Sequence, residues 1–366
     1  MVSLNPPKPD NDCVRRPEHY KGRGARNNPA NRFYSEHSEL IDDGWYQDDI
    51  PDSIATEVRS ENAKTIISRN RSPDVPFNRS INPYRGCEHG CIYCFARPSH
   101  AYWDMSPGLD FETRIISKPN AALLLEKEII HPKYICKPIA LGVNTDAYQP
   151  LEKQLKITRG LLEVLQAYQH PFTLITKGTL VLRDLDIIAA MARKNLCSLA
   201  VSLTTLDVSL KRIMEPRASS PASRLRIVRE LSAAGVPTTV LIAPVIPFIN
   251  DAEIEAIVTA AKNAGARKVG YVYIRLPLEI EELFTGWLSE HFPERANHVM
   301  NVIRSTRGGK AYQSAFGKRM VGEGPIADII RQRFKVSERK AGLNDVNDSV
   351  LDCSLFTGGD PQLDLF

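Results

Sequence analysis

Short strand-like segments alternate with amphipathic helical segments from about residue 80 onward, and this alternation most constrains the fold. Such β–α repeats place their strands side by side in a parallel sheet. The predicted strands are Ile81–Tyr84, Ile139–Asn144, Phe172–Thr176, Leu199–Leu203, Thr238–Ala243 and Val269–Ile274. The predicted helices are Ala121–Ile130, Gln154–Tyr168, Leu182–Lys194, Ser223–Ala234 and Ala252–Asn263. These repeats are too few for a full eight-fold barrel.

Three cysteines, Cys87, Cys91 and Cys94, follow the first predicted strand with Cys-x3-Cys-x2-Cys spacing. Their thiolates can bind a metal, but three ligands are one fewer than a four-coordinate site needs. Structural metal sites close their shell, whereas reactive sites keep a position open. A [4Fe–4S] cluster held by four cysteines is coordinatively full, and one held by three keeps an iron free for a small molecule. The spacing favours such an open cluster site.

A structural zinc site completed by His89 or His100 is the alternative. His89 lies between the first two cysteines and would have to fold back sharply, so His100 is better placed. Zinc ligands usually come as two short-spaced couples, and the sequence has no second couple. The chain has seven cysteines without a paired pattern, which fits a reducing cytosol better than a disulfide framework.

The cysteine spacing, with Tyr93 just before the last cysteine, resembles the radical S-adenosylmethionine (radical SAM) superfamily. The resemblance implies that Cys87, Cys91 and Cys94 bind a [4Fe–4S] cluster, that S-adenosylmethionine chelates its free iron, and that Tyr93 lies beside the adenine. An electron from a flavodoxin- or ferredoxin-type donor would then cleave S-adenosylmethionine to methionine and a 5′-deoxyadenosyl radical. The resemblance also implies a partial (β/α)6 TIM-like barrel, in agreement with the six predicted strands.

Polar residues follow the later strands, at the ends where the loops of such barrels converge. Asn144, Thr145 and Asp146 follow the second strand and can bond an amino acid's ammonium and carboxylate groups. Lys177 follows the third strand and can meet a carboxylate, and the resemblance places Ser202 near the ribose. An ordinary Asx turn and helix cap, a solvated lysine and a buried serine bonded to backbone are the alternatives.

Tyr271, Tyr273 and Arg275 alternate along the sixth predicted strand, which predicts that they share one face. Hydrogen-atom relay by the tyrosines and plain packing in the barrel core are the two interpretations. In the loop after the fourth strand, Arg217 is predicted either to bind an anion or to pair with Glu215.

Residues 82–98 and 145–150 resemble the spore-photoproduct-lyase-like group of radical SAM enzymes, which is DNA-repair-photolyase-related. This resemblance implies lyase-type DNA repair, in which a cysteine returns a hydrogen atom to the lesion. Cys136 lies in the region where that donor would be sought, but it precedes the second predicted strand. We therefore expect Cys136 to be an inert, half-buried thiol, and dimer reversal by the same route is in doubt.

The sequence divides into four predicted parts. Residues 1–75 form an irregular, flexible N-terminal segment, in which 21–29 is either a loose lead or a basic arm. Residues 76–285 form the radical SAM core, residues 286–345 a basic, mostly helical C-terminal extension, and residues 346–366 a flexible tail. In the extension, Ser305–Lys310 is predicted either to hold phosphates, with Tyr312 and Phe316 nearby for base stacking, or to carry solvated charges.

The last five residues, Gln362–Phe366, resemble the peptide with which bacterial replication and repair proteins dock on the DNA sliding clamp. A segment folded onto the protein's own surface is the alternative. No apolar run approaches the roughly 20 residues that a membrane helix needs, and the first residues lack the pattern of a secretory signal. We therefore expect a cytoplasmic protein without a membrane partner.

The predicted function is a radical SAM enzyme that acts on DNA, with the sliding clamp as a possible second partner. The first alternative is a radical SAM enzyme acting on RNA, a peptide or a metabolite. The second is a non-catalytic, clamp-associated protein whose metal is structural. The catalytic residues and the exact substrate do not follow from the sequence.

Overall fold

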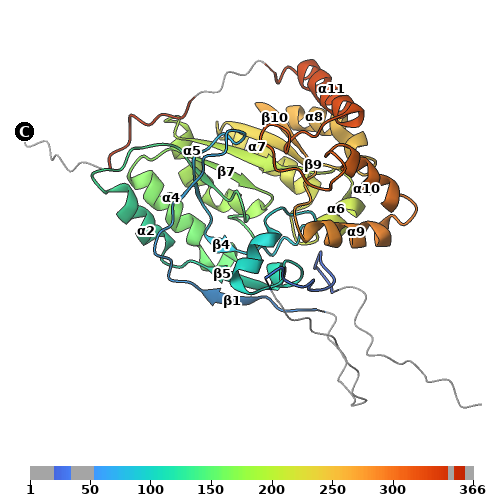
Figure 1. Ribbon diagram of the computed structural model, residues 1–366. Helices are drawn as coiled ribbons and strands as arrows, with labels where there is room; N and C mark the ends of the chain where they lie inside the picture. Colours follow the sequence, from blue (N-terminus) through green and yellow to red (C-terminus); the bar gives the residue numbers. More distant parts are fainter. Residues whose placement is uncertain (1–19, 34–52, 345–349, 359–366) are drawn as a thin grey trace, which may run out of the picture.

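A computed structural model describes residues 20–33, 53–344 and 350–358. Six parallel strands form one sheet, and their order in space follows their order in the chain (Figure 1). They are β3 (Arg79–Ile81), β6 (Ile139–Leu141), β7 (Phe172–Thr176), β8 (Cys197–Ser202), β9 (Thr238–Val245) and β10 (Lys268–Tyr273). The strand β2 (Ser68–Arg69) pairs antiparallel with β3, so β2 and β10 are the edges. This arrangement confirms the predicted α/β fold with six parallel strands.

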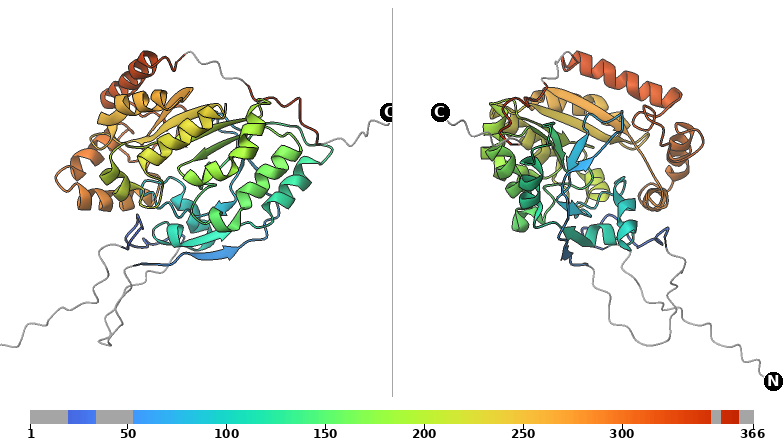
Figure 2. Two further views of the ribbon diagram at one scale, coloured as in Figure 1. Left: turned by 180° about the vertical axis from the view of Figure 1, so that it is seen from behind. Right: turned by 60° about the vertical axis from the view of Figure 1, so that its left-hand side comes forward.

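Helices cover the outer face of this sheet, while Figure 1 looks into its inner face (Figure 2, left). The helices between the strands are α2 (Ala121–Ile129), α3 (Glu152–Leu155), α4 (Ile157–Ala167), α5 (Leu185–Ala192), α6 (Val208–Met214), α7 (Pro221–Ala233) and α8 (Ile254–Asn263). Short 3-10 helices precede α5 and α8, at Thr179–Asp184 and Asp251–Glu253. The predicted helices are therefore present. The 3-10 turns displace the starts of α5 and α8, and the predicted helix Gln154–Tyr168 is divided into α3 and α4 at Lys156.

The first predicted strand, Ile81–Tyr84, is split in the structure. Strand β3 ends at Ile81, and β4 (Tyr84–Arg85) pairs with β5 (Arg114–Ser117) in a second sheet that β1 (Glu57–Ser60) completes. Pro83 lies at the break, and proline cannot donate the hydrogen bond that a continuous central strand needs. The cysteine segment leaves from β4 and runs into a 3-10 helix (Arg97–Trp103) and α1 (Asp110–Thr113).

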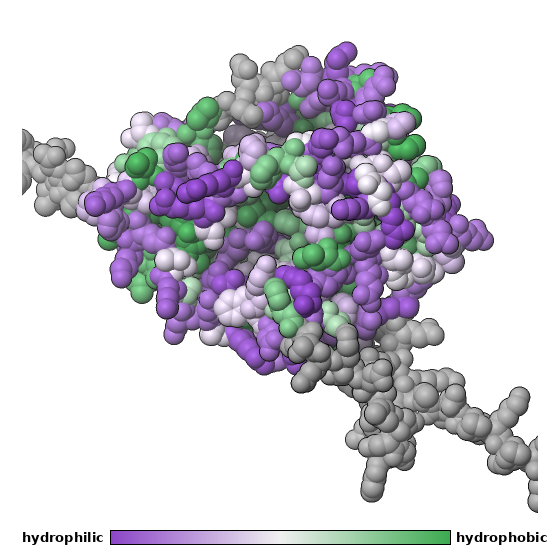
Figure 3. Space-filling view, in the orientation of Figure 1, coloured by the Kyte–Doolittle hydropathy of each residue, from purple (hydrophilic) through white to green (hydrophobic). Residues whose placement is uncertain are grey.

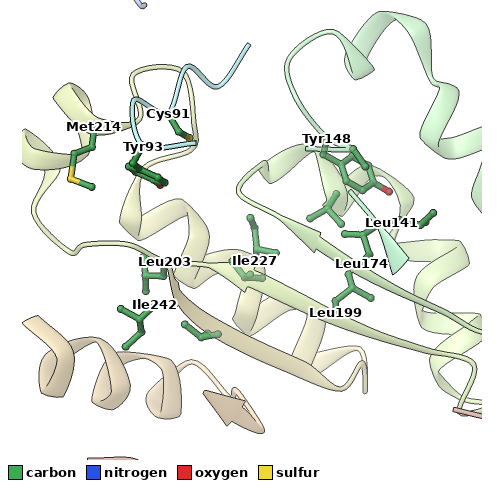
Figure 4. Packing of buried hydrophobic residues seen from close by; sticks show 14 of the residues in the cluster. Cys91, Tyr93, Leu141, Tyr148, Leu174, Leu199, Leu203, Met214, Ile227 and Ile242 are labelled. Carbon is green, nitrogen blue, oxygen red and sulfur yellow. The ribbon is translucent and has the colours of Figure 1, made fainter. Parts of the chain in front are cut away.

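The core between sheet and helices is built from aligned apolar residues on neighbouring strands. Leu141 is in register with Leu174, and Leu174 is in register with Leu199, so their side chains form a row across three strands (Figure 4). All three are almost completely buried. Burial of one leucine contributes about 1.5–3 kcal/mol to folding, so rows of this kind hold the strand ends, and the loops that follow them, in fixed positions.

Three further helices lie beyond the sixth strand: α9 (Ile280–His291), α10 (Ala296–Ser305) and α11 (Pro325–Lys340). Helix α11 packs against α8 and β10 at the edge of the sheet. Residues 350–358 return to the other side, where the amide of Thr357 donates to the carbonyl of Tyr168 at 3.1 Å. Within the described part of the chain, every helix is too short or too polar to cross a bilayer.

Candidate functional site: a three-cysteine cavity

The cysteine loop is held in place by backbone and side-chain contacts from two sides. The amide of Cys87 donates to the carbonyl of Phe111 at 2.9 Å. On the other side, the fully buried Gln149 donates to the carbonyl of Gly86 at 3.2 Å and accepts from the amide of Glu88 at 2.9 Å. Gln149 comes from the loop after β6, so the second repeat of the fold positions the loop that follows the first.

The described N-terminal segment, residues 20–33, packs directly on this loop. A Cβ atom added at Gly24 would lie 1.9 Å from the carbonyl oxygen of Gly90, so only glycine fits there without a shift. The buried carboxylate of Glu112 accepts from the amide of Gly24 at 2.8 Å and from the guanidinium of Arg97. Arg97 in turn donates to the carbonyl of Cys91 at 2.9 Å. A buried ion pair thereby joins the N-terminal segment to the cysteine loop.

All three cysteines line one cavity of about 220 Å³ at the C-terminal ends of the parallel strands. Figure 3 shows a hollow near the centre of this face, with hydrophobic residues inside it and hydrophilic residues around its rim. Five of the six residues predicted to bind the cofactor also line this cavity: Tyr93, Asn144, Asp146, Lys177 and Ser202. Thr145 lies outside the lining because its buried hydroxyl donates to the carbonyl of Tyr84 at 2.8 Å.

A buried carboxylate that the sequence analysis did not single out for this role, Glu215, organises one wall of the cavity. The hydroxyl of Tyr93 and the guanidinium of Arg224 both donate to it. The ammonium of Lys177 lies 4.0 Å from the same carboxylate and donates to the Ser202 hydroxyl at 2.9 Å. Burial alone would raise the pKa of Glu215, but Arg224 and then Lys177 lower it to about 2. Glu215 is therefore ionised and fixes the ring of Tyr93.

A second carboxylate that is largely buried, Asp146, orders another part of the cavity lining. Its oxygens accept from the Thr176 hydroxyl and the Lys177 amide, each at 2.7 Å, and lie 3.3 Å from His89 Nδ1. Burial alone would raise the pKa of Asp146, but His89 and these hydrogen bonds lower it to about 2. The neighbouring Asn144 keeps an exposed side chain at the cavity.

The cysteines fit an iron–sulfur cluster better than a structural zinc ion. Neither predicted fourth ligand completes the set: His89 faces Asp146, and His100 lies outside the lining of the cavity that the cysteines share. Within the described residues no three potential ligands surround a single ion. In a [4Fe–4S] cluster each ligating cysteine binds a different iron atom. The sulfur atoms of the three cysteines would therefore lie around the cluster and would not converge on a single ion.

Burial controls the protonation of two of the three thiols. It raises the pKa of Cys87 well above its ordinary range, and burial followed by the Glu215 charge raises that of Cys91 to about 12. Metal ligation requires the thiolate, so a cluster bound here would displace the protons of these two thiols.

Several other predicted residues have structural roles. Arg217 pairs with Glu88 at 3.1 Å, so the predicted pairing with Glu215 is wrong. Tyr273 and Arg275 line the cavity, but a bulge separates them from Tyr271. The ring of Tyr271 packs on Phe334 of α11 at 4.8 Å, so the prediction of one shared face is wrong.

Five basic residues of the C-terminal extension pair with carboxylates of the described chain: Arg304, Lys318, Arg319, Arg331 and Arg333. Arg307, within the predicted phosphate-binding segment Ser305–Lys310, is buried and donates to the carbonyls of Ile274 and Arg319 at 2.6 and 2.8 Å. Its role there is to tie the segment to the end of β10. The predicted clamp-binding peptide, Gln362–Phe366, lies outside the described residues.

Cys136 is half-buried, as expected, and it precedes β6, whereas the cavity lies beyond the other end of that strand. Burial, followed by the nearby thiol of Cys353, raises its pKa to about 12. A thiol with a raised pKa is a poor nucleophile at neutral pH, in keeping with the predicted inert thiol.

Comparison with known proteins identifies the family. The Radical SAM superfamily pattern matches residues 81–261. A protein of Mycobacterium tuberculosis, itself described as uncharacterized, is 37% identical over 232 residues, covering 63% of this chain and 68% of its own length. An uncharacterized protein of Methanocaldococcus jannaschii is 27% identical over 248 residues, covering 67% of this chain and 87% of its own length.

Among solved structures, spore photoproduct lyase complexed with dinucleoside spore photoproduct has a similar fold. It has a TM-score of 0.53 at 13% identity, covering 77% of this chain and 79% of that chain. At this identity the similarity shows the fold alone. Together with the family match and the three-cysteine cavity, it leads to one conclusion: the chain belongs to the radical SAM superfamily, whose enzymes use a [4Fe–4S] cluster, S-adenosylmethionine and a reductant.

Proposed function

We propose that this protein is a radical SAM enzyme that acts on nucleic acid, with its substrate entering along a cationic groove beside the three-cysteine cavity. A second cavity of about 540 Å³ adjoins the first and shares Phe95, Val143, Asn144 and Arg275 with it. We call it the arginine groove, because Arg32, Arg69, Arg275 and Arg319 line it. Its aromatic lining residues are Phe77, Phe95, Tyr102 and Tyr312.

Arg275, at the junction of the two cavities, is the observation that carries the proposal. Its guanidinium lies over the ring of Phe95 at 4.3 Å, and burial lowers its pKa from the ordinary value. Among the described residues it has no hydrogen bond or ion pair with a carboxylate, unlike Arg32, which pairs with Glu279, and Arg319, which pairs with Asp74. An anion from outside the protein would supply the missing partner.

Phosphate beside aromatic rings is the chemistry that matches such a lining. Guanidinium groups bind phosphate oxygens in bidentate fashion and stack on flat rings. Aromatic side chains in a cationic groove stack the bases of a single strand, and this stacking tolerates many sequences. Spore photoproduct lyase, whose fold is similar, has been captured with S-adenosylmethionine and a dinucleoside photoproduct, which supports a nucleic-acid substrate here.

In this proposal Cys87, Cys91 and Cys94 would hold the cluster, which with bound S-adenosylmethionine supplies a hydrogen-abstracting 5′-deoxyadenosyl radical. The chain's own residues orient the cofactor. Lys177 and Ser202 present an ammonium and a hydroxyl to the cavity, already hydrogen-bonded at 2.9 Å. Tyr93, fixed by Glu215, offers an aromatic surface. The apolar part of the lining excludes water, which protects a radical from side reactions.

Isotope transfer tests this proposal. Anaerobically reconstituted, reduced protein is incubated with S-adenosylmethionine and single-stranded DNA or RNA carrying deuterium on its sugar and base carbons. We expect mass spectrometry to find deuterium in 5′-deoxyadenosine. Formation of 5′-deoxyadenosine without deuterium from any damaged or undamaged nucleic acid would refute the substrate assignment, while leaving the radical chemistry intact.

A further inference from the structure

A third cavity, of about 470 Å³, lies at the opposite end of the sheet, where the parallel strands begin. Arg79 is the first residue of β3, and Lys133 lies in the segment that precedes β6. We call it the lysine cavity. Its cationic lining residues are Lys64, Arg69, Arg79, Lys127 and Lys133. These cationic residues have no role in the radical chemistry, because the cysteines lie beyond the other ends of the strands.

The lysine cavity carries a strong excess of positive charge. Its one acidic lining residue is Glu128, and this carboxylate accepts a hydrogen bond from the amide of Ile66 at 2.6 Å. Lys64, Lys127 and Lys133 form no ion pair within the described part of the chain. Several cations gathered around a cavity repel one another, so they create a site that favours a multiply charged anion.

Arg79 gives independent evidence that the cavity is built for a ligand. Its side chain is only 8% exposed, and its guanidinium lies over the ring of Tyr134 at 4.6 Å. Its Nη1 atom is buried without a hydrogen-bond partner among the described residues. A buried charged donor left unpaired is costly, and a phosphate oxygen in the cavity would satisfy it.

One residue belongs to the linings of both the lysine cavity and the arginine groove. Arg69 lines both of them, and it is paired with Arg79 across the antiparallel strands β2 and β3. The groove in turn shares four residues with the three-cysteine cavity. A cationic path therefore runs from the cysteines along the β2 edge of the sheet to the far end of the molecule.

We propose that the lysine cavity binds a backbone phosphate of the same nucleic-acid strand whose reacting nucleotide occupies the three-cysteine cavity. This inference rests on the proposed function and adds a second point of attachment to it. Two attachment points on one strand raise the overall affinity without any new contact at the reacting nucleotide. They also make the enzyme prefer strands long enough to span both cavities over a dinucleotide.

The test compares Lys127→Gln/Lys133→Gln with the matched control Lys335→Gln/Arg339→Gln, which removes two exposed charges from α11. Fluorescence anisotropy follows binding of a labelled dinucleotide and of a single strand of about 16 nucleotides over a salt series. Loss of this one phosphate contact should lower the magnitude of the salt slope by about 0.7 and weaken binding of the long strand about fivefold at 0.1 M salt. Dinucleotide binding and the control should be unchanged.

Equal salt slopes for the cavity variant and the wild type would overturn the inference. Formation of 5′-deoxyadenosine without nucleic acid, measured in parallel, shows that each variant keeps its cluster and fold. A calorimetric titration with inorganic pyrophosphate distinguishes a strand from a free phosphate compound. The strand assignment would be overturned if the wild type bound pyrophosphate but no strand of any length, and the cavity variant bound no pyrophosphate. Failure of the proposed function would instead appear as strand binding without deuterium transfer.

Discussion

The charged residues of the three-cysteine cavity and of the lysine cavity are neutralised in different ways. The lining of the arginine groove shares residues with both cavities. In the first, Glu215 is paired with Arg224, and Asp146 faces His89, all within the protein. In the second, the lysines have no partner among the described residues and Arg79 keeps an unsatisfied donor. Internal pairing in a low-dielectric cavity holds a site rigid. Unpaired cations near solvent instead require an external anion, and salt screens their attraction.

The largest expected effect is confined to the three-cysteine cavity and leaves the arginine groove and the lysine cavity unchanged. Cys91→Ala should abolish the reductive formation of 5′-deoxyadenosine, by roughly 10³-fold or more, because one ligand of a three-cysteine site is lost. Binding of a single strand should stay within about twofold, since the arginine groove and lysine cavity are untouched. Chromatographic assay of 5′-deoxyadenosine and fluorescence anisotropy measure the two effects, and iron analysis reports the loss of the cluster. Cys136→Ser is the control, and loss of activity in it equal to that of Cys91→Ala would contradict the assignment of the site.

Removing a charge from the paired network should destabilise the fold. Glu215→Gln leaves the buried Arg224 uncompensated, which should lower the free energy of unfolding by about 3–5 kcal/mol. The pKa of Glu215 is lowered to about 2 in the folded protein, against about 4.3 in the unfolded chain. Its stabilisation is therefore full above about pH 4.3 and is lost as the pH falls toward 2.

Urea unfolding at pH 7 and at pH 3 measures this contribution, and the difference between wild type and Glu215→Gln should shrink at the lower pH. Glu163→Gln is the matched control. Glu163 is 56% exposed and pairs with Arg159 on the surface of α4, so its loss should change stability by less than about 1 kcal/mol. An equal effect of the two variants would show that the buried network contributes no more than a surface pair.

A smaller effect is expected where the N-terminal segment meets the cysteine loop. Gly24→Ala would place Cβ 1.9 Å from the carbonyl oxygen of Gly90, and such overpacking typically costs about 1–3 kcal/mol. Cluster absorbance in air should decay faster in this variant, because the segment that covers the loop must shift. Gly160→Ala, in the middle of α4, meets only Ala122 at 3.5 Å and should be neutral or stabilising by up to about 1 kcal/mol.

The smallest effect concerns the junction between the regions. Arg275→Gln should weaken binding of a single strand about tenfold, as expected for loss of one charged hydrogen bond of about 1.5 kcal/mol. Formation of 5′-deoxyadenosine without nucleic acid should stay within about twofold. Arg226→Gln removes an exposed arginine of α7 that pairs with Glu230 and should bind like the wild type. Unchanged affinity in Arg275→Gln would remove the main support for the nucleic-acid proposal.

Local sequence patterns predicted the helices and strands better than the points at which these elements end and the partners with which they pair. Phe172–Thr176 is a strand with the predicted boundaries, because a short β-branched and aromatic run between helices has few alternatives. The first strand is displaced because Pro83 interrupts it, and Tyr84 pairs with a segment some thirty residues later. Residues 1–75 were predicted to be an irregular, flexible segment. The described residues 20–33 contain no helix or strand, but their backbone bonds to Glu112, a partner that sequence distance conceals.

Residues close together in the chain were enough to predict the radical SAM assignment, because the spacing of Cys87, Cys91 and Cys94 and the repeated β–α pattern are both local features. Which charges are neutralised depends on the folded chain. Glu215 meets Tyr93 across 122 positions, and Arg319 meets Asp74 across 245. Electrostatic pairing depends on distance in space and on burial, so the difference between the internally paired three-cysteine cavity and the lysine cavity, whose lysines have no ion pair among the described residues, appears only once the chain is folded.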